Sequence, residues 1–158
     1  MLRSSKIKPF LWFDTEAEEA AKFYTSVFPN SKMGRVLRFP EASPRPAGMV
    51  LTVEFELEGQ PFVALNGGPE YKFTPAVSFC VDCKDQAEID YSWEKLTAGG
   101  KPVMCGWLED RYGVSWQIVP GKMDEYFSGT DPKRAERVMQ AMHTMVKLDI
   151  AKLEEAAR

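Results

Sequence analysis

The stretch Ile7–Pro29, IKPFLWFDTEAEEAAKFYTSVFP, decides the fold class because its hydrophobic period changes within it. Ile7–Phe13 is apolar, rich in β-forming residues and bounded by polar ones, which predicts a strand. Thr15 and Glu18 then fit a capping box at the start of a helix. Apolar residues follow at helical spacing, and these are Ala17, Ala20, Ala21, Tyr24, Val27 and Phe28. The chain therefore opens with a strand that leads directly into a helix.

Three further strands complete the first half of the chain. Met33–Phe39 predicts a strand, and the proline-rich stretch after it predicts a loop. Met49–Leu57 gives the clearest strand pattern, because apolar residues occupy every odd position. After the turn at 58–60, Pro61–Leu65 returns alongside it. The predicted order is β-α-β-β-β.

The same order recurs in the second half. Ala76–Val81 predicts a strand, Asp85–Leu96 a helix that Gly99-Gly100 ends, and Pro102–Trp107 another strand. A short hairpin leads into the last strand, Val114–Val119. A pattern that runs twice indicates an α+β protein made of two βαβββ modules, at residues 1–70 and 71–121.

Residues 122–158 are expected to form a helical extension. Val138, Met139, Met142 and Met145 make an apolar stripe, and Asp149 is placed to cap a last helix from Ile150. Methionine-rich stripes adapt to irregular surfaces. We expect the stripe to cover the domain's own sheet or to contact a partner chain.

Composition narrows the classes of function. The net charge is −3, and no basic stripe of the kind used by nucleic-acid-binding proteins is present. No run of 18 apolar residues predicts a membrane span, and the start of the chain does not resemble a signal peptide. We therefore expect a cytoplasmic protein that binds neither nucleic acid nor membrane.

The three cysteines do not predict a disulfide framework, because their number is odd and small. Cys80 and Cys83 have C-x-x-C spacing, but the only histidine is His143, far along the chain. A structural zinc site would need two more ligands, and a redox motif would open a helix rather than lie in a strand. Buried structural cysteine is the favoured interpretation.

Several motifs resemble the PhnB-like proteins of the vicinal oxygen chelate superfamily, which includes glyoxalase I, extradiol dioxygenases and bleomycin resistance proteins. The resemblance spans residues 7–120. In the first half it is carried by Leu11-Trp-Phe-Asp14, by Glu18-Glu-Ala-Ala-Lys-Phe-Tyr24 and by Val27-Phe-Pro29. In the second half it is carried by Cys105-Gly-Trp107, by Asp110-Arg-Tyr-Gly113 and by Val114-Ser-Trp-Gln-Ile118.

The resemblance implies paired βαβββ modules whose sheets form a half-open barrel around a ligand cleft. In metal-dependent relatives, strands 1 and 4 of each module carry histidine or acidic ligands. The corresponding positions here are Lys8, Ala76, Gln117 and either Ala64 or Asn66. Alanine has no donor atom and lysine is a poor ligand at neutral pH. The resemblance therefore implies no metal of the glyoxalase kind, and we predict no cofactor.

Some members of this family carry the label 3-demethylubiquinone-9 3-methyltransferase. Transfer of a methyl group from S-adenosylmethionine usually relies on a doubly wound sheet with a glycine-rich first loop. Asn66-Gly-Gly-Pro69 is the only glycine cluster after a predicted strand, and no helix start follows it. A tight turn is the better interpretation.

Polar and aromatic residues on the expected pocket strands are the candidates for binding. Aromatic rings provide large apolar contacts with a polar handle, although each tryptophan alone is more often a core residue. Gln117 takes the place of a metal ligand and offers an amide that both donates and accepts hydrogen bonds. The predicted ligand-binding residues are Trp12, Asn66, Ser78, Trp107, Trp116 and Gln117.

Glu54 is the candidate catalytic residue. If its side chain faces the interior of the pocket, burial would make it a general base. If it faces outward, it is a solvated carboxylate without a role. The alternation of Met49–Leu57 does not decide which face Glu54 occupies.

Three hypotheses remain open. The first is a metal-free small-molecule binding protein, a homodimer, with an aromatic or hydrophobic ligand. The second is an enzyme, either a lyase or isomerase that uses Glu54 or the methyltransferase of the family label. The third is an interaction module with a filled core and no ligand.

Overall fold

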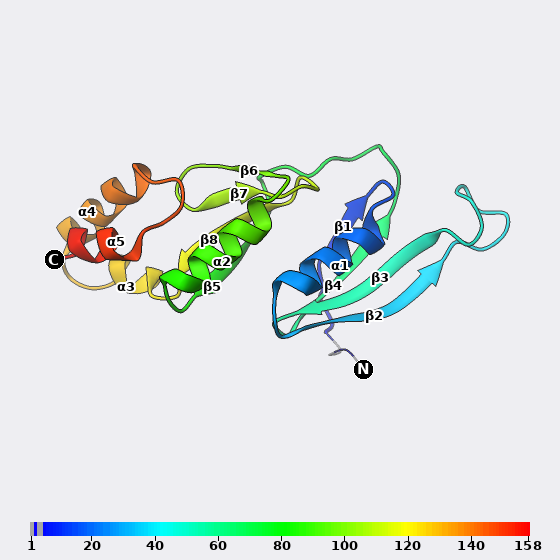
Figure 1. The fold of residues 1–158 in the computed structure, drawn as a ribbon, viewed down its shortest axis with the longest axis horizontal. Helices are drawn as coiled ribbons and strands as arrows, with labels where there is room; N and C mark the ends of the chain where they lie inside the picture. Colours follow the sequence, from blue (N-terminus) through cyan, green and yellow to red (C-terminus); the bar gives the residue numbers. More distant parts are fainter. Residues whose placement is uncertain (1, 3–4) are drawn as a thin grey trace. The chain divides into compact units, whose positions relative to one another are not determined.

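A computed structural model describes residue 2 and residues 5–158. The chain divides into two compact units, of which the first ends at Lys72 and the second runs from Phe73 to Arg158. Each unit contains one four-stranded mixed sheet with a helix across one face (Figure 1). The α+β class with two βαβββ modules is therefore confirmed, while neither sheet closes into a barrel.

In the first unit the sheet has the order β1-β4-β3-β2. Its elements are β1 (Phe10–Phe13), α1 (Ala17–Val27), β2 (Ser31–Arg38), β3 (Val50–Leu57) and β4 (Gln60–Asn66). β1 and β4 are parallel, and the other pairs are antiparallel. The observed β1 begins at Phe10, whereas the predicted strand began at Ile7. Ile7 is 85% exposed and lies outside the strand.

The predicted apolar face of α1 is buried against the sheet. Ala17, Ala20, Ala21 and Tyr24 are fully buried. The ring of Tyr24 stacks on Phe55 of β3 at 6.2 Å between centroids, and Phe55 stacks on Phe62 of β4 at 5.3 Å. This aromatic stack lies within the buried core of the unit.

The predicted capping box at Thr15 and Glu18 is wrong. The N-cap residue of α1 is Glu16, and no side chain of its own caps the helix. Instead the side-chain oxygen of Asn66, at the end of β4, accepts a hydrogen bond from the backbone N–H of Ala17 at 2.9 Å. The cap comes from a residue distant in sequence, which a local motif cannot reveal.

The second unit repeats the arrangement with the order β5-β8-β7-β6. Its elements are β5 (Ser78–Cys83), α2 (Gln86–Thr97), β6 (Lys101–Pro102), β7 (Trp107–Glu109) and β8 (Ser115–Pro120). β5 and β8 are parallel. Asp85 caps α2 by accepting from the N–H of Glu88 at 2.9 Å.

The predicted strand over Pro102–Trp107 is interrupted. Cys105 and Gly106 both have positive φ, at 62° and 81°, so the chain leaves the extended conformation there. Their backbone N–H groups donate to Met145 and Val146 at 2.8 and 2.7 Å. Hydrogen bonds to the C-terminal segment replace the continuous strand at this point.

The C-terminal extension forms part of the second unit. It contains α3 (Met123–Phe127), α4 (Pro132–His143) and α5 (Ile150–Ala156), and Asp149 caps α5 as predicted. Val138, Met145, Leu148 and Leu153 pack with Val119 of β8 in one buried cluster. At least part of the predicted apolar stripe therefore covers the chain's own sheet. Within the described residues, none of the helices is long and apolar enough to cross a membrane.

Candidate functional site

The helix-free face of the first sheet carries a cavity of 490 Å³. Because Phe55 packs under α1, its neighbour Glu54 points to the opposite face. Strand register brings Glu54 beside Val63 of β4, and Val63 beside Phe10 of β1. The cavity is lined by charged and apolar side chains from three strands and the segment before β1, among them Lys8, Lys32, Met33, Arg35, Glu54 and Val63.

Glu54 forms an ion pair at the wall of this cavity. Its carboxylate accepts a hydrogen bond from the guanidinium of Arg35 at 3.1 Å. The Glu54 side chain is 27% exposed and that of Arg35 is 67% exposed. The pair therefore remains in contact with water and contributes modestly to stability. It holds a carboxylate and a guanidinium side by side at the cavity wall.

Gly34 allows β2 to approach β3 closely at this point. A Cβ atom on Gly34 would lie 3.0 Å from the Cβ and the carbonyl oxygen of Glu54 and would overlap the side chain of Leu2. The strand pairing also shifts register between Met33 and Val36. Such irregularities re-aim side chains at an edge strand, and here Met33, Gly34 and Arg35 all line the cavity.

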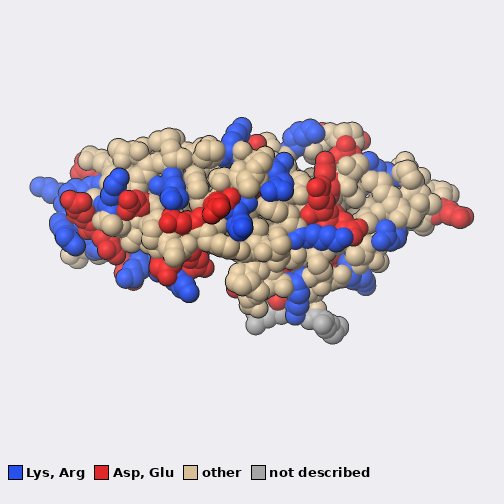
Figure 2. Space-filling model, in the orientation of Figure 1, with Lys and Arg blue, Asp and Glu red and all other residues tan. Residues whose placement is uncertain are grey.

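Positive charge prevails along the cavity wall. Among the described lining residues, Lys8, Lys32 and Arg35 contribute three cations and Glu54 one carboxylate, while Glu56 of β3 lies opposite Lys32. Pro61 and Val63, both buried, supply apolar surface between them. Elsewhere, the face of the protein in Figure 2 shows basic and acidic side chains intermixed. The cavity can therefore accept an acidic group on an apolar body.

Sequence reasoning placed Lys8 here only as a failed metal ligand, and it missed Lys32 and Arg35. The available signal was the neighbouring charge pattern. Glu54 and Glu56 alternate with apolar residues in β3, and Lys32 lies opposite Glu56 in the adjacent strand. Cross-strand pairs of opposite charge are a known feature of one sheet face.

Trp12 lies at one end of the first sheet and uses its polar handle within the protein. Its indole N–H donates to the carbonyl oxygen of Gly68 at 2.9 Å, and its ring meets Tyr71 edge-on at 5.0 Å. A Cβ atom on Gly67 would overlap the ring. Trp12 thus packs against the chain that leaves β4, and it remains half-buried.

Asn66 is buried, with 2% of its surface exposed. Its oxygen caps α1, and its amide nitrogen donates to the carbonyl of Val50 at 3.0 Å. Both ends of the side chain are engaged within the first unit.

Three of the predicted residues come together on one face of the second sheet. The amide nitrogen of Gln117 donates to the hydroxyl of Ser78 at 2.9 Å. Trp107 pairs directly with Gln117 across the β7–β8 ladder, and both are half-buried. This face presents an aromatic ring beside a hydroxyl and an amide.

Trp116 lies on the other face of β8. It is 3% exposed, its ring packs against Phe79 at 5.4 Å, and its indole N–H donates to the carboxylate of Asp110 at 2.9 Å. Asp110 also accepts from the backbone N–H groups of Tyr112 and Val114. The structure places Trp116 among the core residues of the unit.

Cys80 and Cys83 are not activated thiols. Burial raises the pKa of Cys83 to about 12, with a further contribution from Glu88. Burial and the neighbouring Asp82 also raise the pKa of Cys80, although its residue is exposed. Nucleophilic and redox thiols need a lowered pKa, so this pair does not support such chemistry.

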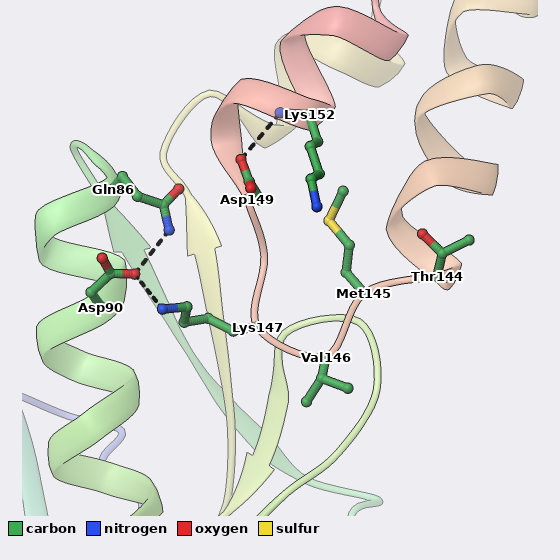
Figure 3. A pocket seen from close by; sticks show the side chains of 8 residues that line it. All are labelled: Gln86, Asp90, Thr144, Met145, Val146, Lys147, Asp149 and Lys152. Carbon is green, nitrogen blue, oxygen red and sulfur yellow. Dashed lines mark hydrogen bonds and ion pairs between the residues drawn. The ribbon is translucent and has the colours of Figure 1, made fainter.

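A second cavity, of 480 Å³, lies between α2 and the segment that follows α4 (Figure 3). Its polar groups hold that segment in place. Gln86 donates to the carbonyl of Leu148 and accepts from the N–H of Ile150, and Lys147 pairs with Asp90 at 2.7 Å. These contacts form a clasp for the C-terminal extension.

The residues at the family's metal-ligand positions do not fit a divalent metal. Ala64 is fully buried, Ala76 lies in the loop before β5, and the amide of Gln117 is bonded to Ser78. Across residue 2 and residues 5–158, no three histidine, cysteine, aspartate or glutamate side chains form a metal-binding group.

The fold also differs from the doubly wound sheet that usually binds S-adenosylmethionine. Both sheets are four-stranded and mixed. Gly67 and Gly68 pack against Trp12 and Glu70, and the chain after them continues as a loop to β5. A phosphate-binding glycine loop instead opens a helix.

Comparison with known proteins identifies the family. The sequence profile of the family described as 3-demethylubiquinone-9 3-methyltransferase matches residues 5–119. A search of curated proteins gives no match. A solved PhnB protein from Bacillus cereus, provisionally given the same methyltransferase description, is 38% identical, with a TM-score of 0.68 over 73% of this chain and 99% of that chain.

Two more distant structures share the fold. Protein PA1353 from Pseudomonas aeruginosa is 22% identical, with a TM-score of 0.60 over 73% of this chain and 96% of that one. The fosfomycin resistance protein FosX from Listeria monocytogenes, solved with Mn(II) and sulfate, is 16% identical, with a TM-score of 0.54 over 80% of this chain and all of that one. The chain belongs to the PhnB-like 3-demethylubiquinone-9 3-methyltransferase family.

Proposed function

We propose that this protein binds a small organic molecule with an aromatic or hydrophobic body and an acidic group. The observation that carries the proposal is the cavity on the helix-free face of the first sheet, where Lys8, Lys32 and Arg35 surround apolar side chains. Ligand sites are typically concave, mostly apolar and fitted with a few polar groups that fix orientation. Arg35 is the first candidate for the acidic group, since a guanidinium matches carboxylate geometry.

The second unit carries, by itself, a separate set of predicted ligand contacts. Trp107 would provide an aromatic surface, while Ser78 and Gln117 would provide hydrogen bonds. Trp12 would contribute the edge of its ring rather than its N–H, which is already bonded to Gly68. We further propose that the protein acts without a metal, as a homodimer in the cytoplasm. Sedimentation of the purified protein tests the dimer.

An enzymatic function is the second candidate, and Glu54 favours it. Its carboxylate lies at the cavity wall beside Arg35, which gives a potential base and a cation in one place. Such a pair suits proton abstraction next to a carbonyl or carboxylate, as in a lyase or isomerase. The methyltransferase of the family description is a further candidate, and it requires S-adenosylmethionine binding.

Calorimetric titration with 1-naphthoate tests the binding proposal, since this probe joins an aromatic body to a carboxylate. Arg35→Met is expected to weaken binding by about tenfold or more, the equivalent of one charge-assisted hydrogen bond. Arg38→Met is the matched control, because Arg38 lies in the same strand and bonds to the carbonyl of Gly48. Equal losses in both variants, or no binding by the wild type, would contradict the proposal.

The same assay separates the alternatives. S-adenosylmethionine that binds while 1-naphthoate does not would favour methyl transfer. For the lyase or isomerase, Glu54→Gln should abolish turnover of a substrate while its binding persists. Stoichiometric metal in the purified protein, with a lower melting temperature after EDTA treatment, would overturn the metal-free proposal.

A further inference from the structure

The cavity on the first sheet contains a negative charge that an acidic ligand leaves unused. Arg35 donates to one carboxylate oxygen of Glu54, Oε1, at 3.1 Å. Within the described residues, the other oxygen, Oε2, has no hydrogen-bond or ion-pair partner. The remaining N–H groups of the Arg35 guanidinium have no acceptor there either. The pair therefore keeps a free acceptor and free donors side by side.

Strand geometry turns this pair toward the cavity. Glu54 lies on the face of β3 opposite the one on which Phe55 packs under α1. Arg35 lies in the irregular part of β2, between Met33 and Val36, and both Glu54 and Arg35 line the cavity. The two side chains are 27% and 67% exposed, so a solute can reach both charged groups.

Apolar surface and a further cation adjoin the pair. Met33 and Val63 line the cavity, and Val63 pairs directly with Glu54 across the β3–β4 ladder. Lys8 adds an ammonium group from the segment before β1. A bound molecule thus meets apolar side chains, a guanidinium and a carboxylate within one cavity of 490 Å³.

A ligand with only one kind of charge matches only part of this wall. An acid without an amine, bound to Arg35, would bring its carboxylate close to the like charge of Glu54. An amine without an acid, bound to Glu54, would bring its cation close to Arg35. Such repulsion between like charges is a source of specificity. A molecule that carries both charges can pair with Glu54 and Arg35 at once.

We propose that the ligand of this cavity is a free amino acid with an apolar side chain. Its ammonium group donates to the free oxygen of Glu54, its carboxylate accepts from Arg35, and its side chain lies against Val63. The two charged groups of an α-amino acid are attached to one carbon, so they stand side by side like the two groups on the wall. The inference rests on the function proposed above and narrows its ligand class, because it adds an amine to the acidic group.

L-Phenylalanine and two analogues that each lack one charge test the inference. 3-Phenylpropionate keeps the carboxylate, phenethylamine keeps the ammonium group, and all three have the same aromatic body. In calorimetric titrations of the full-length protein, we expect L-phenylalanine to bind at least about tenfold more tightly than either analogue, the equivalent of one charge-assisted hydrogen bond. Amide NMR should show shifted signals for residues of the cavity lining, including Gly34, Arg35 and Val63.

Glu54→Gln separates recognition of the amine from recognition of the acid. The variant should lose the preference for L-phenylalanine over 3-phenylpropionate. It should bind 3-phenylpropionate at least as tightly as the wild type does, because a like charge has been removed, and this binding also shows that the cavity is intact. Glu58→Gln is the matched control and should keep the preference. Glu58 lies in the adjoining turn, outside the described lining, and its carboxylate accepts from the N–H of Asn30.

The outcomes distinguish this inference from the function on which it rests. Binding of either analogue as tightly as L-phenylalanine, or an unchanged preference in Glu54→Gln, would overturn the amino-acid inference. Binding of 1-naphthoate that depends on Arg35 would leave the acidic ligand of the proposed function standing in that case. Failure of all four compounds to bind would overturn both.

Discussion

Each unit of this protein contains a buried polar side chain that connects separate backbone segments or groups by hydrogen bonds, and these two anchors have opposite chemistry. Asn66 in the first unit accepts from Ala17 and donates to Val50. Asp110 in the second unit only accepts, from Tyr112, Val114 and Trp116. Both are nearly inaccessible to water, with 2% and 3% exposed.

The difference shows that the repeated fold does not repeat its polar contacts. The first unit needs an amide because its anchor lies between a helix N-terminus and a strand carbonyl. The second needs a carboxylate because three N–H groups converge on one side chain. Exchanging the two chemistries therefore tests whether each side chain is required for its hydrogen bonds or only for its size.

Asp110→Asn should have the largest effect. Its oxygen can still accept from the backbone, but its NH₂ group would face the indole N–H of Trp116, which donates at 2.9 Å. Two donors would then be buried without acceptors. We expect a loss of about 2–4 kcal/mol in the free energy of unfolding, measured by urea denaturation.

Trp116→Phe is the informative companion to that variant. It removes the indole N–H that would clash with an asparagine at 110, so the double variant should lose less stability than the sum of the single variants. Strict additivity would show that Asp110 and Trp116 are not energetically coupled.

Asn66→Asp should have the next largest effect, about 1–3 kcal/mol. The new carboxylate would still accept from Ala17 at the start of α1, where the helix dipole favours negative charge. Its second oxygen, however, would face the carbonyl of Val50 without a proton between them. Asn66→Ala, measured in the same urea assay, loses both contacts and gives the reference for the loss caused by Asn66→Asp. If Asn66→Asp is as stable as the wild type, the hydrogen bond to Val50 contributes nothing to stability.

These anchors also show how far sequence reasoning reached. The period change at Phe13–Ala17, the alternation of β3 and the repeat of β-α-β-β-β are local patterns, and they predicted the architecture. Asn66 is predicted as a ligand contact because the resemblance places it near a pocket position of the fourth strand. Its role in capping α1 could not be predicted locally, since its hydrogen-bond partners Ala17 and Val50 lie 49 and 16 residues away.

The candidate site was only partly predictable for the same reason. Strand alternation placed Glu54 opposite the apolar residues of β3, but it could not tell which face the helix would cover. The stacking of Tyr24 on Phe55 decides that question. Arg35 was missed because it lies at the register shift of β2, between Met33 and Val36, whereas Lys32 pairs regularly with Glu56 and was missed because the strand pairing was not predicted.

The smallest effect concerns a contact found in the second unit, the clasp between α2 and the C-terminal segment. A hydrogen bond from Lys147, assisted by Gln86, holds the pKa of Asp90 below its usual value. A carboxylate whose pKa is lowered by folding stabilises the protein above its unfolded pKa, and this contribution disappears as the pH falls through the folded value. The clasp should therefore weaken in acid, below about pH 4.

Lys147→Met removes the main cause of that shift, so less stability should be lost between pH 7 and pH 3 than in the wild type. The urea midpoint at each pH measures the difference. Lys152→Met serves as the control, because Lys152 lines the same cavity while the lysine paired with Asp90 is Lys147 (Figure 3). Both side chains of the ion pair are substantially exposed, at 43% and 49%, so the difference should be small. An identical acid response in wild type and Lys147→Met would mean that the hydrogen bonds of Gln86 to Leu148 and Ile150, rather than the ion pair, hold the extension in place.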